Sequence, residues 1–122
     1  MEIIEKGKVA GIDDLKYKKA SNGKYAFSVD DDEDSYTTPF IYDSYKVMSD
    51  RQLRTEKKEP DGTKKFGLIV TCGHDLALPC IFDKIKPFND DELLAYIGNK
   101  QYVVDRYGSV CRKEIYDMKH GS

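Results

Sequence analysis

Large apolar residues recur at every second position in three short segments of the chain, each of which begins with an aromatic residue. The apolar positions are Tyr25, Phe27 and Val29 in the first segment, Phe66, Leu68 and Val70 in the second, and Tyr102 and Val104 in the third. Because residues two apart point to the same face of a strand, each segment predicts a β-strand with one apolar face. Turn signals typical of hairpins precede the three segments: Asn22-Gly23, Pro60-Asp61-Gly62 and Gly98-Asn99.

A second pattern, an isoleucine followed by an aromatic residue and an aspartate, recurs downstream of these segments. Residues 39–46 match residues 79–86 without a gap, residues 114–117 give a third copy, and residues 12–16 give a partial one. An aspartate that ends a strand usually accepts hydrogen bonds from nearby backbone N–H groups, and an aromatic residue beside it usually lies in the core. We therefore expect structural roles for the aspartates and rings of this pattern: Asp13, Asp43, Asp83, Asp117, Tyr42, Phe82 and Tyr116.

Residues 89–98 carry conflicting signals. Asn89, followed three positions later by Glu92 and closed by Gly98, is typical of a short helix. The repeating pattern instead predicts that Leu94–Ile97 is the strand before the Gly98-Asn99 turn. We favour the strand, because register in a repeating sheet is set collectively, whereas so short a helix is marginal without packing.

The recurring unit resembles the WG (KWG) repeat of bacterial β-proteins. That repeat has a glycine turn, a Lys-Trp-Gly or close variant, an aliphatic strand, and a proline-containing strand that runs to Tyr-Asp. Residues 65–69 with 79–85 match best, followed by residues 99–108 and, more loosely, 22–46. Tyr25, Phe66 and Tyr102 stand in place of the tryptophan, and only Gly67 keeps the glycine after it. The resemblance covers roughly residues 12 to 117 and implies a chain of antiparallel hairpins with a binding or scaffolding role.

These patterns together predict an all-β fold, an antiparallel β-hairpin repeat array of about three and a half WG-like units. The array forms a single domain over residues 1–122, with units at about 12–46, 47–86 and 87–117. Three units of about forty residues also suit a β-trefoil. The unequal spacing of the units favours the open array.

Composition narrows the class of partner. The chain has 122 residues, and its 20 basic and 22 acidic side chains nearly cancel to a net charge of −2. Neutralising many phosphates needs a clear basic excess, so the balance disfavours nucleic acid. Apolar runs are far shorter than the roughly 20 residues that cross a bilayer, so we expect no membrane partner. The N-terminus has no secretory pattern, and the three cysteines form no CxxC pair, which together favour a reduced, cytoplasmic protein.

Candidate chemistry is confined to the turn at residues 72–75. Cys72 and His74 offer a thiolate and an imidazole, but a metal site or a nucleophilic enzyme needs further ligands, a positioned base and an oxyanion hole. We therefore expect a non-enzymatic protein with no catalytic residue, metal or cofactor. The alternative is a small-ligand or metal-binding protein, or a minor enzyme, that uses Cys72 and His74. A disulfide between Cys72 and Cys80 is a second alternative, since these residues flank a hairpin.

Two charged loops are candidate surfaces for binding another protein. The first is the acidic run from Asp30 to Asp34. It does not follow the EF-hand pattern, because Ser35 and Ile41 stand where that calcium loop needs glycine and glutamate. We therefore interpret it as a solvated turn. Charged loops usually keep a small domain soluble; the alternative is that they steer a partner into register, and on that alternative the hypothesis is a protein-binding module. Its narrower form is an immunity-type or phage-borne inhibitor that neutralises a partner protein. Unpaired end strands of an open array add a homodimer as a further hypothesis. The candidate contact residues are Asp30, Asp31, Asp32, Glu33 and Asp34 in the acidic run and Arg54, Lys57 and Lys58 in the second hairpin.

Overall fold

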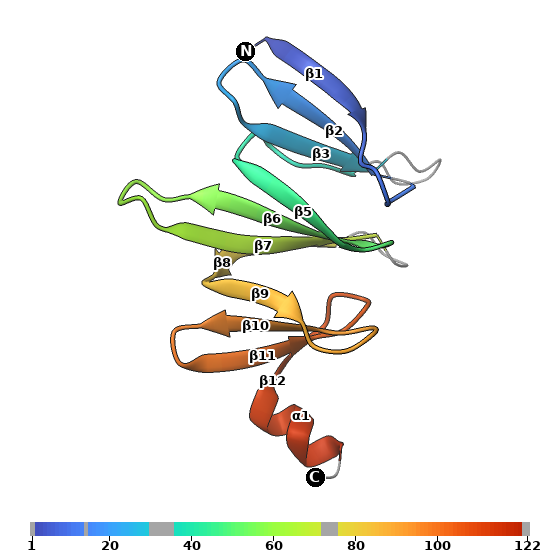
Figure 1. Ribbon diagram of the computed structural model, residues 1–122, viewed down its shortest axis with the longest axis vertical. Coiled ribbons are helices and arrows are strands. Elements are labelled where there is room, and N and C mark those ends of the chain that lie inside the picture. Colours follow the sequence, from blue (N-terminus) through green and yellow to red (C-terminus); the bar gives the residue numbers. More distant parts are fainter. Residues whose placement is uncertain (1, 14, 30–35, 72–75, 121–122) are drawn as a thin grey trace.

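The computed structural model describes residues 2–13, 15–29, 36–71 and 76–120. Within these ranges the chain forms three four-stranded antiparallel sheets, followed by one short helix (Figure 1). The expected all-β fold is confirmed. None of these three sheets closes into a barrel, so the open arrangement describes them and the trefoil does not.

The first sheet has the strand order β1-β2-β3-β4 and forms one end of the molecule in Figure 1. A tight turn at Asn22 and Gly23 joins β2 to β3. Gly23 has a φ of 86°, and the Asn22 side chain accepts a hydrogen bond of 3.0 Å from the backbone N–H of Lys24. The predicted Asn-Gly turn therefore forms with the backbone geometry that favours glycine. The strands are β1 (Ile3–Lys8), β2 (Leu15–Ala20), β3 (Tyr25–Val29) and β4 (Tyr36–Thr37).

The second sheet has the order β5-β6-β7-β8 and lies between the other two (Figure 1). Its central hairpin, β6–β7, has seven residues in each strand and a register that runs from Gln52 opposite Val70 to Lys58 opposite Lys64. Its turn contains Gly62 with a φ of 91°. The strands are β5 (Ser44–Ser49), β6 (Gln52–Lys58), β7 (Lys64–Val70) and β8 (Leu76–Phe82).

The third sheet has the order β12-β11-β10-β9 and contains the segment with conflicting signals. The strand prediction is confirmed, because β10 pairs with β11 from Leu93 to Ile97. The signals read as a helix start instead shape a tight turn. The Asn89 side chain accepts from the N–H groups of Asp91 (3.0 Å) and Glu92 (2.9 Å) and donates to the Glu92 carboxylate at 2.7 Å. The strands are β9 (Lys84–Pro87), β10 (Leu93–Ile97), β11 (Lys100–Val104) and β12 (Val110–Arg112).

The middle sheet contributes to both hydrophobic cores. Consecutive residues of β7 point to opposite faces, so Ile69 lies in the core shared with the first sheet, while Leu68 and Val70 lie in the core shared with the third. This explains why β7 is apolar without interruption from Leu68 to Val70. The first core consists of Val9, Ile12, Leu15, Phe27, Val29, Tyr42, Leu53 and Ile69, and the second of Leu68, Val70, Phe82, Ile85, Leu93, Ala95 and Val104.

The chain passes from the first sheet to the second at Asp43. Tyr42 bridges to Tyr25 of β3 and is buried in the first core, and β5 begins at the next residue after Asp43. The Asp43 carboxylate forms an ion pair with Lys24 and accepts a 2.7 Å hydrogen bond from the backbone N–H of Lys58. The hydrogen bond from Lys24, followed by the one from Lys58, holds the pKa of Asp43 below its usual value.

The passage from the second sheet to the third, at Asp83, has matching contacts. Phe82 pairs with Phe66 and is buried in the second core, and β9 begins after Asp83. The Asp83 carboxylate accepts a 2.7 Å hydrogen bond from the backbone N–H of Gly98 and forms an ion pair with Lys65. These two contacts, in that order, lower the pKa of Asp83. Each aspartate thus contacts a hairpin that precedes it in the chain and a hairpin that follows it.

Asp13 and Asp117 do not share this geometry. Asp13 lies exposed in the connection between β1 and β2, next to the buried Ile12. This connection joins two strands of the same sheet, whereas Asp43 and Asp83 lie where the chain passes from one sheet to the next. Asp117 lies on α1 (Lys113–Lys119) and pairs with Lys113 one turn earlier at 2.7 Å. The expectation that Asp117 ends a strand is therefore wrong.

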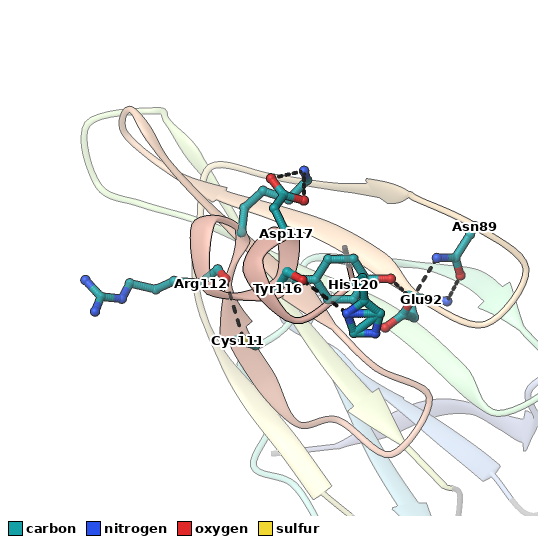
Figure 2. A network of polar contacts seen from close by, with 8 residues as sticks. Asn89, Glu92, Cys111, Arg112, Tyr116, Asp117 and His120 are labelled. Atoms are coloured by element: carbon teal, nitrogen blue, oxygen red, sulfur yellow. Dashed lines mark hydrogen bonds and ion pairs between the residues drawn. The ribbon is translucent and has the colours of Figure 1, made fainter. Parts of the chain in front are cut away.

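Tyr116 also departs from the pattern, because it lies on α1 and outside both cores. Its hydroxyl donates to the Glu92 carboxylate at 2.7 Å, and its ring stacks on His120 with centroids 4.0 Å apart. Figure 2 shows Tyr116 with Glu92 and His120. Strand β12 pairs with β11 only as far as Arg112. In the described part of the chain no further sheet follows β12, so residues 113–119 have no neighbouring strand to pair with. A helix satisfies their backbone N–H and C=O groups by hydrogen bonds within the segment.

Helix α1 contacts the outer side of the third sheet. Leu94 and Val103 lie opposite each other on the face turned away from Ala95 and Val104, yet they are only 6% and 2% exposed. Helix α1 contacts β11 and β12. We conclude that the helix contributes to covering this apolar face, as a terminal cap does in stacked folds.

Candidate interaction surface

The β6–β7 hairpin reaches farther sideways than the β2–β3 and β10–β11 turns in Figure 1. Its tip is fixed internally, because the Asp61 carboxylate accepts hydrogen bonds from the backbone N–H (3.0 Å) and the hydroxyl (2.7 Å) of Thr63. The hydroxyl bond, followed by the backbone bond, lowers the pKa of Asp61. The tip therefore presents an ordered turn to solvent.

Lysines face each other across this hairpin. The strand register places Lys57 opposite Lys65 and Lys58 opposite Lys64. Like charges directly opposite each other on adjacent strands are destabilising. Lys65 is compensated by Asp83, and the Lys64 ammonium lies 3.9 Å from a Glu56 carboxylate oxygen.

Lys57 and Lys58 keep their charges available at the hairpin. Among the residues described, neither side chain has a carboxylate within 4.0 Å. The contact of Lys58 with Asp43 is made by its backbone N–H, so its side chain is left to solvent, where it is exposed. These two expected partner residues therefore lie on one projecting basic element.

Arg54, the third expected partner residue of this hairpin, has a different environment. Its guanidinium carbon lies 4.6 Å from the centroid of the Phe66 ring, which is a cation–π contact. The residue is half-buried, and its Nε atom is buried without a hydrogen-bond partner. Arg54 thus mainly covers the edge of the second core, and the structure does not bring its charge to the hairpin tip.

Two sets of candidate residues, Asp30 to Asp34 and the pair Cys72 and His74, lie outside the described residues. Cys80, on β8, is a free thiol whose sulfur lies 3.4 Å from the hydroxyl of Thr55. Burial is the main cause that raises the pKa of Cys80, which leaves little thiolate at neutral pH. Among the described residues, no group of three or more His, Cys, Asp or Glu side chains is placed to hold a metal ion.

A second basic surface escaped the sequence interpretation. It lies on the face of the first sheet that points away from the second sheet, and its signal was the spacing of lysines two apart in two neighbouring strands. Together these side chains border an open depression of about 530 Å³. The residues around it are Lys6, Gly7, Lys8, Lys16, Tyr17, Lys18, Ser28 and Thr37.

No known protein family, curated protein or solved structure matches the chain. Within the described ranges, no helix has the length and apolar character needed to span a membrane.

Proposed function

We propose that the protein is a non-catalytic protein-binding module built from WG-like units, and that the tip of the β6–β7 hairpin contacts the partner. The observation that carries the proposal is the opposed lysine pairs at the end of a projecting hairpin. Within each pair, Lys57 and Lys58 have no carboxylate within 4.0 Å among the described residues. An acidic surface on the partner supplies the opposite charge for these two lysines, which favours association and sets its orientation. The matching contacts of Asp43 and Asp83 support the repeating unit.

The narrower proposal is an inhibitor of the immunity or phage-borne type, in which the bound partner loses its activity. A small rigid stack with a fixed hairpin suits this role, because little conformational entropy is lost on binding. The acidic run from Asp30 to Asp34 is a further candidate contact of this module.

The test uses affinity capture from the source cell with three proteins: the wild type, a double variant with Lys57→Glu and Lys58→Glu, and the control Lys100→Glu. Lys100 is an exposed lysine at the start of β11, away from this hairpin. We expect one protein to be captured by the wild type and the control and to be lost with the double variant. Equal capture by all three proteins contradicts the proposed hairpin surface.

The captured partner, once purified, tests the remaining steps. The double variant Lys57→Glu, Lys58→Glu is expected to bind the partner about tenfold more weakly or worse, since each ion pair between a lysine and an acidic residue of the partner contributes on the order of 1 kcal/mol. Added salt is expected to slow association with the wild type and to affect the double variant less. If a stoichiometric amount of the wild type leaves the partner's own activity unchanged, the inhibitor role is wrong while the binding role stands.

A further inference from the structure

The β6–β7 hairpin carries lysines on both of its faces. The strand register sets Lys57 opposite Lys65 and Lys58 opposite Lys64. Because successive residues of a strand point to opposite faces, the first pair lies on one face of the hairpin and the second pair on the other. A flat partner surface laid against this hairpin meets one pair only, whereas a partner that meets both pairs surrounds the hairpin.

Each face of the hairpin keeps one lysine without an ion pair. Among the residues that the structure describes, neither Lys57 nor Lys58 has a carboxylate within 4.0 Å, while the lysine opposite each of them does. Residues 57–65 contain four lysines and two acidic residues, Glu59 and Asp61, and the Asp61 carboxylate is already engaged within the turn. The end of the hairpin therefore offers positive charge on both sides.

Two exposed isoleucines of the recurring pattern lie beside the base of this hairpin. Ile41 and Ile81 are 37% and 49% exposed, although the aromatic residues that follow them, Tyr42 and Phe82, are buried. Neither isoleucine belongs to a core. Strand propensity accounts for Ile81, which lies in β8, but Ile41 lies outside any strand. The same exposed apolar residue at equivalent positions on both sides of one hairpin indicates a role at the surface.

Ile41 is fixed near β6. Its backbone N–H donates to the carbonyl oxygen of Pro39 at 3.0 Å. Two residues later, the N–H of Asp43 donates to the carbonyl oxygen of Glu56 at 2.8 Å, and its carboxylate accepts from the N–H of Lys58 at 2.7 Å. These contacts hold the chain around Ile41 against β6.

Ile81 is fixed near β7. The next residue, Phe82, pairs with Phe66. Earlier in β8 the backbone lies so close to β7 that a Cβ atom at Gly67 would approach the carbonyl carbon of Pro79 to 3.0 Å. In Figure 1 the starts of β5 and β9, shortly after the two isoleucines, lie on the same side of the molecule as the hairpin turn. Little conformational freedom is therefore lost when a partner contacts these positions.

We propose that the β6–β7 hairpin inserts into a cleft of the partner protein that has acidic residues on both walls and an apolar rim. The walls contact Lys57 and Lys58, and the rim contacts Ile41 and Ile81. Apolar contacts around a charged centre exclude water from it, which strengthens its ion pairs. The inference rests on the proposed function and adds to it the shape and the chemistry of the partner's site.

The probe is the partner purified from the capture experiment described above, and its binding to each variant of the full chain is measured by isothermal titration calorimetry. The single variants Lys57→Glu and Lys58→Glu test the cleft, because a cleft contacts both residues and a flat surface contacts only one. We expect each single variant to weaken binding by about fivefold or more. Circular dichroism and a urea unfolding curve establish that each variant is folded.

The double variant Ile41→Thr, Ile81→Thr tests the rim, because threonine keeps the β-branched shape and removes apolar surface. We expect it to bind about tenfold more weakly or worse, mainly through faster dissociation, with the salt dependence of association unchanged. Ile41→Val with Ile81→Val keeps the apolar surface and should retain binding. The control Ile4→Thr, at a 58% exposed position on β1 at one end of the molecule, should bind as the wild type does.

An effect of only one of the two lysine variants overturns the cleft, because the partner then lies against one face of the hairpin. Unchanged binding of the threonine pair, or an equal loss in Ile4→Thr, overturns the apolar rim. In both cases a loss of binding in the double variant Lys57→Glu, Lys58→Glu still supports the proposed function. Capture of a nucleic acid in place of a protein overturns the acidic walls, because phosphates then meet the lysines. Absence of any protein that the wild type captures and the double variant loses contradicts the proposed function and this inference together.

Discussion

The aspartates of the recurring pattern show how one side chain can hold three segments together. Asp43 receives a hydrogen bond from the Lys24 side chain of the hairpin behind it and another from the Lys58 backbone of the hairpin ahead. Asp83 receives the corresponding contacts from Lys65 and Gly98. Because each carboxylate sits where the chain changes sheets, its loss affects the junction between sheets more than any single strand.

Replacement of Asp43 by asparagine is expected to lower the free energy of unfolding by about 1 kcal/mol. A hydrogen bond to a charged group contributes somewhat more than this when it is shielded from solvent. The Lys24–Asp43 pair is partly exposed, which reduces its contribution. Urea unfolding measures the change. The matched control is Asp13→Asn, an exposed turn residue expected to stay within about 0.5 kcal/mol of the wild type. Equal effects of the two variants would contradict the special role of Asp43.

The contribution of Asp43 should also depend on pH. Its pKa in the folded protein is lowered, chiefly by the Lys24 hydrogen bond and then by the Lys58 N–H. The stabilisation is therefore fully present above the unfolded pKa of about 3.9 and is lost as the pH falls through the folded pKa. Urea unfolding at several pH values should show a constant difference between the wild type and Asp43→Asn from about pH 7 to 5 and a shrinking one below about pH 4. A difference that grows on acidification has the wrong sign for this account.

Gly67 is required by close packing between β7 and β8. A Cβ atom at this position would lie 2.5 Å from the backbone oxygen of Leu78 and 2.9 Å from the hydroxyl of Thr55. Relief of the first contact requires the backbone of β8 to move, so Gly67→Ala is expected to cost about 2 kcal/mol or more. Ala26 follows Tyr25 in β3 as Gly67 follows Phe66 in β7, and the buried alanine fits there. The need for glycine therefore comes from the local contact between β7 and β8.

The control for Gly67→Ala is Gly62→Ala, in the β6–β7 turn. A Cβ at Gly62 meets no atom within 4 Å, but its φ of 91° strains an alanine by about 1 kcal/mol. Thermal or urea unfolding should therefore rank Gly67→Ala as the more destabilising of the two. The reverse ranking would contradict the contact between Gly67 and the β8 backbone.

At the scale of elements, the sequence predicts strands well where several units constrain one another. The strand at Leu93–Ile97 follows from the pattern because its register must match β9 and β11, even though Asn89 and Glu92 imitate a helix start. Residues 115–117 have the same sequence, Ile-Tyr-Asp, as residues 41–43 but lie in a helix. The pattern describes which side chains are available and does not reveal whether a neighbouring strand exists to pair with them.

The same limit applies to the candidate surfaces. Lys57 and Lys58 are found from sequence because they flank a recognisable turn, whereas the half-buried position of Arg54 depends on Phe66, a neighbour in space that no local pattern reveals. The lysine face of the first sheet was missed because β1 precedes the first expected unit, at residues 12–46. Its pairing with β2, which brings Lys6 and Lys18 together, is a tertiary fact.

Helix α1 is held to the third sheet by few contacts, and none of its residues is buried. Tyr116→Ala removes the hydrogen bond to Glu92 and the rings' contacts with Phe88 and His120. We expect amide hydrogen exchange to accelerate in α1 while β6 and β7 keep their protection, since weakly packed elements open locally. Met118→Ala is the control, because Met118 is 82% exposed. Unchanged exchange of α1 in Tyr116→Ala would contradict this anchoring role.

The whole molecule depends on the middle sheet, which contributes to both cores. Leu68 and Ile69 are adjacent in sequence but lie in different cores, and each is at most 1% exposed. Each outer sheet has one face against the middle sheet. The other face of the first sheet carries charged side chains, and the other face of the third sheet contacts α1. The stack should therefore unfold as one cooperative unit whose most stable part is β6 and β7.

Amide hydrogen exchange followed residue by residue in the wild type and in Leu68→Ala tests this arrangement most directly. The slowest amides should belong to β6 and β7, with exchange that requires global unfolding. Leu68→Ala should lower the unfolding free energy by about 2 to 5 kcal/mol and accelerate those slow amides together with the slowest amides of the first and third sheets. Acceleration confined to the second sheet, or slowest exchange in an outer sheet, would contradict a stack that depends on its middle layer.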